Sequence, residues 1–475
     1  MNFASSTFLI FLLVVLLLYH LTRQRAHRYA VLLAGSWVFY MSWNPWLIVV
    51  LWFVTIVNYG TGRLIDTAGT SRQRFRWLLL GMVCNLTTLG FFKYTTFLLE
   101  STQQLGQWLG WDWPAWGARI ALPLGISFFT FQGISYIIDV YQRKLAATRS
   151  FLDFAMYLAF FPQLVSGPIV RASQFLPQMT TPPRVTARQV VEGLHWFLLG
   201  MIKKVFIADQ LALFVDPVFA APGQFDAATH RWAMIAYAAQ IYCDFSGYSD
   251  IAMGCAKWFG FELPVNFRFP YVAGSITDFW RRWHISLGNW IKDYLYIPLG
   301  GNRQGSWRTY ANLITAMTLC GLWHGASWTC LVWGFYNGVL LSAHRVWDRA
   351  LQGRVWADHL RGHLLYRMAA IPCTFLLVLV GLVCIRAESW PDCWLVTQSL
   401  VGVPATTGSA QLLPAWTFAL VALVAAGHLL NGWGETRCRW LELPPLARGL
   451  SYSIALSLLI IFAPVASKPF IYFQY

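Results

Sequence analysis

Charged residues are scarce in this chain. Only 12% of its 475 residues are Asp, Glu, Lys or Arg, whereas 57% are hydrophobic. Soluble domains carry roughly a quarter charged residues, so this composition excludes an ordinary soluble protein. Apolar runs of roughly 15 to 24 residues, the length that crosses a bilayer as a helix, recur along the whole chain. The sequence therefore predicts an all-α polytopic membrane protein built as one integral-membrane domain over residues 1–475.

Three other absences narrow the possibilities. The apolar runs lack the period-two alternation of a transmembrane barrel. The nine cysteines form no C-x-x-C pair, which argues against a disulfide framework and a metal site. No Walker loop and no G-x-G-x-x-G stretch is present, so a bound nucleotide must be held by side chains and not by a glycine cradle.

Acidic residues are outnumbered, 20 to 35, and the net charge is +15. The arginines lie in short segments between apolar runs, which is the positive-inside pattern of membrane proteins and not a nucleic-acid-binding surface. Residues 7–21, followed by Arg23, Arg25 and Arg28, are predicted to be a retained first span with the N-terminus outside. The same rule predicts about ten spans, a re-entrant segment near residues 152–165, an acidic outer loop at 209–231, and both termini outside the membrane.

A second re-entrant segment is predicted at residues 311–343. It lies between a cationic segment at 256–310 and another beginning at Arg345, so both of its ends are expected on the cytoplasmic side. Two full spans need about 40 residues, and only 33 are available. We therefore expect a hairpin that turns inside the membrane at His324-Gly325.

His324 is the strongest candidate for catalysis. An ionisable side chain in the bilayer interior is costly and usually faces the bundle interior or a water-filled cavity. Burial there favours a neutral imidazole, whose ring nitrogen can accept a proton. Gly321 and Gly325 allow another group to approach closely. The alternative is a histidine that only bridges two helices by hydrogen bonds.

His284 lies in a cationic, tryptophan-rich stretch, Asp278-Phe-Trp-Arg-Arg-Trp-His284. One interpretation is an amphipathic helix anchored at the lipid headgroups. The other is that Arg281, Arg282 and Lys292 gather the phosphates of an anionic cosubstrate at the mouth of a tunnel. The sequence leaves both open.

Other polar residues in apolar runs receive simpler interpretations. Asp244 and Asp250 are expected to form a structural ion pair, line a cavity, or pair with the region of Arg281 and Arg282. The remaining histidines are expected at span ends or in loops, as surface or boundary residues: 20, 27, 195, 230, 344, 359, 363 and 428.

Five stretches together form a recognisable pattern: Leu122–Gln132, Phe160–Arg171, Tyr242–Asp250, Trp280–His284 and Gly321–Gly325. With them the chain resembles, over nearly its full length, the membrane-bound O-acyltransferase family, in particular its bacterial polysaccharide O-acetyltransferases and teichoic-acid D-alanyltransferases. The last two stretches are the most specific parts of the resemblance.

The resemblance implies a ring of helices around a thin central region pierced by a tunnel. The residue matching His324 lies at its narrow middle as general base, and the one matching His284 has a supporting role on the cytoplasmic side. An acyl thioester enters from the cytoplasm and a hydroxyl acceptor from outside. Trp323 and Asn289 are considered as donors to the developing oxyanion, with no feature that selects either.

The C-terminal residues 468–475, Lys-Pro-Phe-Ile-Tyr-Phe-Gln-Tyr, resemble the aromatic tail of this branch. The resemblance implies an extracytoplasmic tail that carries the acyl group on a tyrosine, here Tyr472. The alternative is an aromatic belt that anchors the chain at the outer interface.

These features lead to a functional hypothesis. The chain is predicted to be a bacterial inner-membrane O-acetyltransferase that passes acetyl from cytoplasmic acetyl-CoA towards an extracytoplasmic polysaccharide, which could be alginate, cellulose or peptidoglycan. A periplasmic acyl-accepting transferase is the expected partner, and no metal is expected. One rival is a transporter or flippase that uses Asp244, Asp250 and His324 as a relay, although no inverted repeat is seen. Another is a scaffold in which His324 is dispensable.

Overall fold

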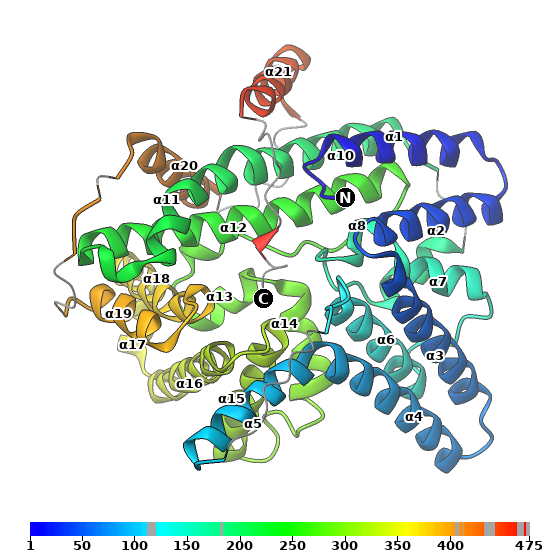
Figure 1. Ribbon diagram of the computed structural model, residues 1–475, viewed down its shortest axis with the longest axis horizontal. Helices are drawn as coiled ribbons and strands as arrows, with labels where there is room; N and C mark the ends of the chain where they lie inside the picture. The colour runs from blue at the N-terminus through cyan, green and yellow to red at the C-terminus, as the bar shows by residue number, and fades with distance from the viewer. Residues whose placement is uncertain are drawn as a thin grey trace. The chain divides into compact units, whose positions relative to one another are not determined.

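The computed structural model describes residues 1–111, 120–180, 184–403, 408–411, 413–431, 442–462 and 470–471 (Figure 1). Within these ranges the regular secondary structure is helical, and the only β interaction is an isolated bridge between Phe225 and Ser409. The prediction of an all-α protein is confirmed.

Contacts group the described residues into two compact units, Met1–Phe197 with Ile251–Pro264 and Leu198–Asp250 with Val265–Tyr475. The single-domain organisation remains a prediction. The first unit contains α1 (Ser6–Leu21), α2 (Arg25–Met41), α3 (Ile48–Thr67), α4 (Ser71–Leu89), α5 (Thr95–Trp108), α6 (Ile126–Tyr141), α7 (Phe151–Ala159), α8 (Phe161–Leu164), α9 (Ala172–Phe175) and most of α10 (Ala187–Met201).

The second unit carries the candidate site. Its helices are α11 (Asp209–Ala220), most of α12 (Ala227–Trp258), α13 (Ile276–Arg282), α14 (Ile285–Ile291), α15 (Ser306–His324), α16 (Trp328–Leu351), α17 (Val355–Gly362), α18 (Leu364–Arg386), α19 (Trp390–Leu400), α20 (Ala415–Asn431) and α21 (Pro445–Ile461). A π-helical segment, Ile202–Ala208, precedes α11.

Several helices have the length and composition of membrane spans. Among the described residues, Pro45–Thr67, Ser71–Trp108 and Leu364–Arg386 are long and apolar enough to cross, and shorter apolar helices occupy Ser6–Leu21, Ala415–Leu430 and Pro445–Ile461. A helix rises about 1.5 Å per residue, so about 20 residues cover the hydrocarbon core. These helices identify a polytopic membrane protein, whereas the count of about ten spans stays a prediction.

Small and amide side chains hold helices together in the first unit. Gly133 of α6 lies directly against Asn58 of α3, where an added Cβ would collide with the amide. Asn58 and Asn85 of α4 exchange two hydrogen bonds through their amides, at 3.0 and 2.9 Å. Small residues allow helix backbones to approach in a membrane, and a reciprocal amide pair satisfies polar groups that lipid cannot.

The structure corrects two predicted boundaries. The outer loop predicted at residues 209–231 is instead largely α11 and the first turn of α12, because Asp209 stands in the first turn of a helix that also tolerates Pro217. The segment predicted to be too short for two spans is longer than 311–343, since α15 and α16 continue through their charged ends to 306 and 351. With 19 and 24 residues they are each about as long as the hydrocarbon core is thick. The predicted bounds of the segment were therefore too narrow, whereas the predicted turn at Gly325 is confirmed. The re-entrant path of the hairpin stays a prediction.

Two histidines expected at the surface are buried. His230 is fully buried, with Nδ1 2.9 Å from the Ser399 hydroxyl and Nε2 2.9 Å from the Pro222 carbonyl oxygen. His428 of α20 is 3% exposed and lies against the rings of Tyr242 and Tyr271. Neither belongs to the cavity described below.

Candidate active site

His324 is placed by a tight helical hairpin. It is the last residue of α15, and the chain turns through Gly325 in an extended conformation before α16 begins at Trp328. The Ser327 hydroxyl caps α16 by accepting a hydrogen bond from the Cys330 amide at 3.1 Å. The turn therefore fixes the direction in which the His324 side chain leaves the backbone.

Three glycines let α15 and α16 pack with their backbones in contact. A Cβ at Gly321 would meet the Cys330 carbonyl and Gly334, and a Cβ at Gly338 would meet the backbone of Ile314. Because glycine has no side chain, these positions bring the helices as close as backbone atoms allow. The hairpin that presents His324 is thus rigid.

Replacing Gly334 by Ala tests this packing. The added methyl would collide with the backbone of Met317 and Thr318, so we expect a loss of about 1–3 kcal/mol from the free energy of unfolding. Thermal unfolding of the detergent-solubilised protein measures it. Gly60→Ala in α3 is the matched control, because nothing lies within 4 Å of a Cβ there. Equal midpoints for the two variants would contradict close packing of the hairpin.

The His324 ring lies among aromatic rings and is 8% exposed as a residue. Its centroid is 4.9 Å from that of Trp333 and 5.1 Å from that of Trp323, both edge to face. The His284 ring is the next neighbour, at 6.1 Å. The hairpin and the cationic stretch thus bring together two histidines that are 40 residues apart in the sequence.

His284 is held in a strained backbone conformation. Its φ of 44° and ψ of 54° are left-handed, which is uncommon outside glycine. The kink between α13 and α14 is fixed by Asn266, whose carbonyl oxygen accepts from the Ile285 amide at 2.9 Å and whose side chain accepts from the Ser286 amide at 3.1 Å. Strain that the surroundings over-determine is typical of functional positions.

The surface-helix interpretation of His284 is wrong, because the residue is fully buried. Its ring packs against Phe245, with centroids 4.7 Å apart, and lies parallel to Phe267. The sequence suggested an exposed cationic helix because arginines adjoin the histidine. In the structure, the kink after Arg282 turns His284 inward while Arg281 remains exposed.

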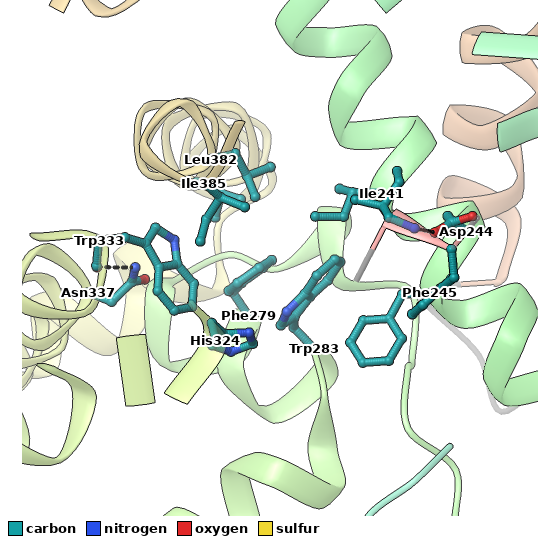
Figure 2. Close-up of a pocket in the computed structure, with 13 residues that line it drawn as sticks. Ile241, Asp244, Phe245, Phe279, Trp283, His324, Trp333, Asn337, Leu382 and Ile385 are labelled. Carbon is teal, nitrogen blue, oxygen red and sulfur yellow. Dashed lines mark hydrogen bonds between the residues drawn. The ribbon is translucent and has the colours of Figure 1, made fainter. Parts of the chain in front are cut away.

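His324 lines a small apolar cavity of about 40 Å³ (Figure 2). Its walls come from α12, α13, the end of α15, α16 and α18, together with a C-terminal segment. Its polar lining groups come from His324, Asn337 and Asp244. The lining residues are Ile241, Asp244, Phe245, Phe279, Trp283, His324, Trp333, Asn337, Val378, Leu382, Ile385, Phe470 and Ile471. Few convergent polar groups in an apolar cavity are the usual composition of a small-molecule site.

Asn337 is a lining residue that the sequence did not single out. Its amide nitrogen donates to the Trp333 carbonyl oxygen at 2.9 Å, and its amide oxygen accepts from the Trp280 indole N–H at 3.2 Å. It therefore holds α13 against α16 on the side of the cavity that carries His324. No local pattern distinguishes it from any other asparagine in an apolar run.

Asp244 and Asp250 pair with lysines and not with Arg281 and Arg282. Lys204 Nζ lies 2.7 Å from Asp244 Oδ1 and 2.8 Å from Asp209 Oδ1, and Lys203 Nζ lies 2.6 Å from Asp250 Oδ2. The expected structural ion pair is confirmed, but its partners were missed. The signal was two adjacent lysines inside the apolar run 190–208.

A C-terminal segment forms part of the cavity wall. The Ile471 amide donates to Asp244 Oδ2 at 2.8 Å, and Phe470 packs between Tyr248 and Phe245, with ring centroids 5.0 and 5.6 Å away. Asp244 therefore joins Lys204 on one oxygen and the C-terminal backbone on the other. Tyr472, the candidate acyl carrier, lies outside the described residues.

The predicted phosphate-binding cations do not line the cavity. Arg281 and Lys292 are exposed, and the Arg282 Nε donates to both oxygens of Asp278 at 3.0 Å. Of the two oxyanion candidates, Asn289 is exposed and Trp323 is 2% exposed beside His324. In the described part of the chain no cluster of three His, Cys, Asp or Glu side chains could hold a metal ion.

Comparison with known proteins agrees with the family resemblance found in the sequence. The model of the membrane-bound O-acyltransferase family matches residues 32–380, more than half of the chain. The chain is 42% identical over 408 residues to the "Probable alginate O-acetylase AlgI" of Pseudomonas aeruginosa, covering 84% of this chain and 75% of that protein. It is 44% identical over 408 residues to the protein of the same name from Azotobacter vinelandii, covering 83% and 77%. It is also 37% identical over 345 residues to the "Peptidoglycan O-acetyltransferase" of Helicobacter pylori, covering 67% and 64%.

Proposed function

Because the chain belongs to the membrane-bound O-acyltransferase family and is therefore an O-acyltransferase, we propose that it transfers acetyl from cytoplasmic acetyl-CoA to a hydroxyl, with His324 as general base. The observation that carries the proposal is the position of His324 at an apolar cavity whose wall includes the C-terminal residues Phe470 and Ile471. In this proposal the acetyl group moves across the inner membrane and leaves on the periplasmic side, where both termini lie.

The reaction needs a base and a place for negative charge. A neutral imidazole of His324 takes the proton of the attacking hydroxyl as its oxygen adds to the thioester carbonyl. The tetrahedral intermediate collapses, the C–S bond breaks, and the imidazolium returns the proton to the departing thiolate. Positioned general-base catalysis of this kind contributes about 10²–10⁴ in rate. Trp323 is the better candidate for stabilising the oxyanion because it is buried beside His324.

His284 supports His324 in this scheme. Its ring lies 6.1 Å from that of His324 and is held by Phe245 and by the strained turn between α13 and α14. We assign it a positioning role, since its ring packs beside those of Trp323 and His324.

The donor is assigned to the cationic side. Phe279 and Trp283 of the α13 region line the cavity, while Arg281 of the same helix is exposed. Phosphates of acetyl-CoA bound by Arg281, Arg282 and Lys292 would place the thioester arm next to the cavity. Side-chain cations suit this task, since the sequence has no glycine cradle for phosphates.

The acceptor is assigned by the names of the relatives. Proteins named for alginate and for peptidoglycan O-acetylation share 37–44% identity with this chain. We propose an extracytoplasmic polysaccharide as the final acceptor, reached through a periplasmic acyl-accepting transferase. The first acceptor within this chain is Tyr472, because it directly follows Ile471, whose amide is bound to Asp244 at the cavity.

Intact-mass analysis after incubation with isotopically labelled acetyl-CoA tests this function. We expect one labelled acetyl group on the C-terminal peptide of the native protein and none there on Tyr472→Phe. His324→Ala should reduce labelling by about 10²–10⁴-fold in initial rate. Tyr452→Phe in α21 is the matched control, because it removes another C-terminal tyrosine hydroxyl that does not line the cavity.

The remaining outcomes separate the parts of the proposal. Label transfer to an added periplasmic transferase without label on the chain would retain the acetyltransferase and reject Tyr472 as carrier. Unchanged product acetylation by a folded His324→Ala protein would reject the base assignment. Absence of any labelled product from native protein, supplied with both donor and acceptor, would reject acetyl-CoA as the donor.

A further inference from the structure

Two cysteines face each other where α18 and α19 meet. Cys384 lies near the end of α18 and Cys393 in the first turn of α19, and their sulfurs are 3.5 Å apart. A disulfide requires about 2.05 Å between sulfurs, so a small movement of the two side chains would allow the bond. The spacing of Cys384 and Cys393 in the sequence did not reveal that their thiols are in contact.

The connection between these helices is short and well anchored. Ala387 donates to the Val383 carbonyl oxygen at 2.8 Å to close α18, and the Cys393 amide donates to the Ser389 carbonyl oxygen at 3.0 Å at the start of α19. The Ser389 hydroxyl caps α19 by accepting from the Asp392 amide at 3.3 Å. These hydrogen bonds fix the two helix ends, so the backbone places the Cys384 and Cys393 side chains next to each other.

The location of this pair favours oxidation. α18 is a 23-residue helix that is long and apolar enough to cross the membrane. Cationic residues, among them Arg354 and Arg367, lie near its first end, so the positive-inside rule puts that end in the cytoplasm and Cys384 at the opposite face. Disulfides form and persist in the periplasm. The location thus depends on the orientation proposed above but not on the proposed reaction.

We propose that Cys384 and Cys393 form a disulfide in the membrane-inserted protein. Cys384 is partly exposed, whereas Cys393 is 5% exposed. The Cys384 thiolate attacks the disulfide of a periplasmic thiol-disulfide oxidoreductase and forms a mixed disulfide. The Cys393 thiolate then displaces the oxidoreductase, which leaves as a dithiol. Two thiols of this chain thus lose two protons and two electrons, and the oxidant gains them.

The bond would stabilise a wall of the cavity. Cys384 packs against the buried cluster of Cys330, Trp333 and Ile385. Leu382 and Ile385, on either side of Cys384 in α18, line the cavity that contains His324. A covalent link to α19 restricts fraying of the last turn of α18 and so keeps these two side chains in place.

Sequential thiol labelling tests the proposal. Cells are quenched in acid, and their protein is denatured and treated with N-ethylmaleimide, which alkylates the free thiols. The protein is then reduced and treated with isotopically labelled N-ethylmaleimide, which marks the cysteines that were in disulfides. Peptide mass spectrometry identifies which reagent each cysteine carries. We expect Cys384 and Cys393 to carry the second reagent and the exposed Cys373 to carry the first. In Cys384→Ser protein, Cys393 should switch to the first reagent.

Thermal unfolding gives an independent readout. A reductant is expected to lower the midpoint of native protein by about 2–4 °C and to leave that of Cys384→Ser unchanged. The proposal would be overturned if both cysteines carried the first reagent in protein from cells, and did so again after the purified native chain was treated with oxidised glutathione. That result would leave acetyl transfer untouched, because the labelling requires no activity.

Discussion

Replacing His324 by Asn is expected to lower the rate of acetyl transfer by about 10²–10⁴-fold. The asparagine amide can form hydrogen bonds and occupies the space of the part of the imidazole ring that is bonded to Cβ. It does not accept a proton at neutral pH. The edge-to-face contacts of the ring with Trp323 and Trp333 would be lost as well. Initial rates of labelled acetyl transfer from acetyl-CoA, measured with purified protein in lipid vesicles, give the effect.

His428→Asn is the matched control for this experiment. His428 is also a buried histidine among aromatic rings in the same unit, but it lies outside the cavity. We expect it to retain activity within a few-fold if it elutes as a single species in size exclusion. Comparable losses in the two variants, with comparable thermal midpoints, would show that any buried imidazole matters and would count against a specific base.

Replacing Lys204 by Met is expected to destabilise the protein by about 3–5 kcal/mol, because two carboxylates would remain buried without a counter-charge. Both partners are deeply buried: the side chains of Asp244 and Asp209 are 1% and 7% exposed. Equilibrium unfolding in mixed micelles measures the loss. Lys144→Met, an exposed control, should change the free energy of unfolding by no more than about 0.5 kcal/mol.

Restoring neutrality should recover stability. In the triple variant Lys204→Met, Asp209→Asn, Asp244→Asn, no uncompensated charge remains, so we expect less destabilisation than in Lys204→Met alone. The amide introduced at position 244 can still accept from the Ile471 backbone N–H through its oxygen, which preserves the anchor of the C-terminal segment. Additive losses from the three substitutions would contradict a coupled ion cluster.

Some of the fold follows from local sequence. Long runs of apolar residues specify helices such as α3 and α18, because each backbone polar group in lipid must be satisfied within its own helix. The turn at Gly325 could also be predicted, since His324-Gly325 interrupts two apolar runs. Predicted ends were less accurate, because α15 and α16 continue past charged residues that hydropathy alone assigns to loops.

The composition and motifs by themselves determined that this is a helical membrane acyltransferase-like chain and that His324 is the residue to examine. Only the tertiary structure placed His284 beside His324, paired Lys204 with Asp244, and brought Ile471 to Asp244 across 227 residues of sequence. The physical reason is that helix formation depends on neighbours within one or two turns. Contacts between distant segments depend instead on which faces pack together. Here those faces are set by the close approach of α15 and α16 at Gly321 and Gly334 and by the strained turn at His284.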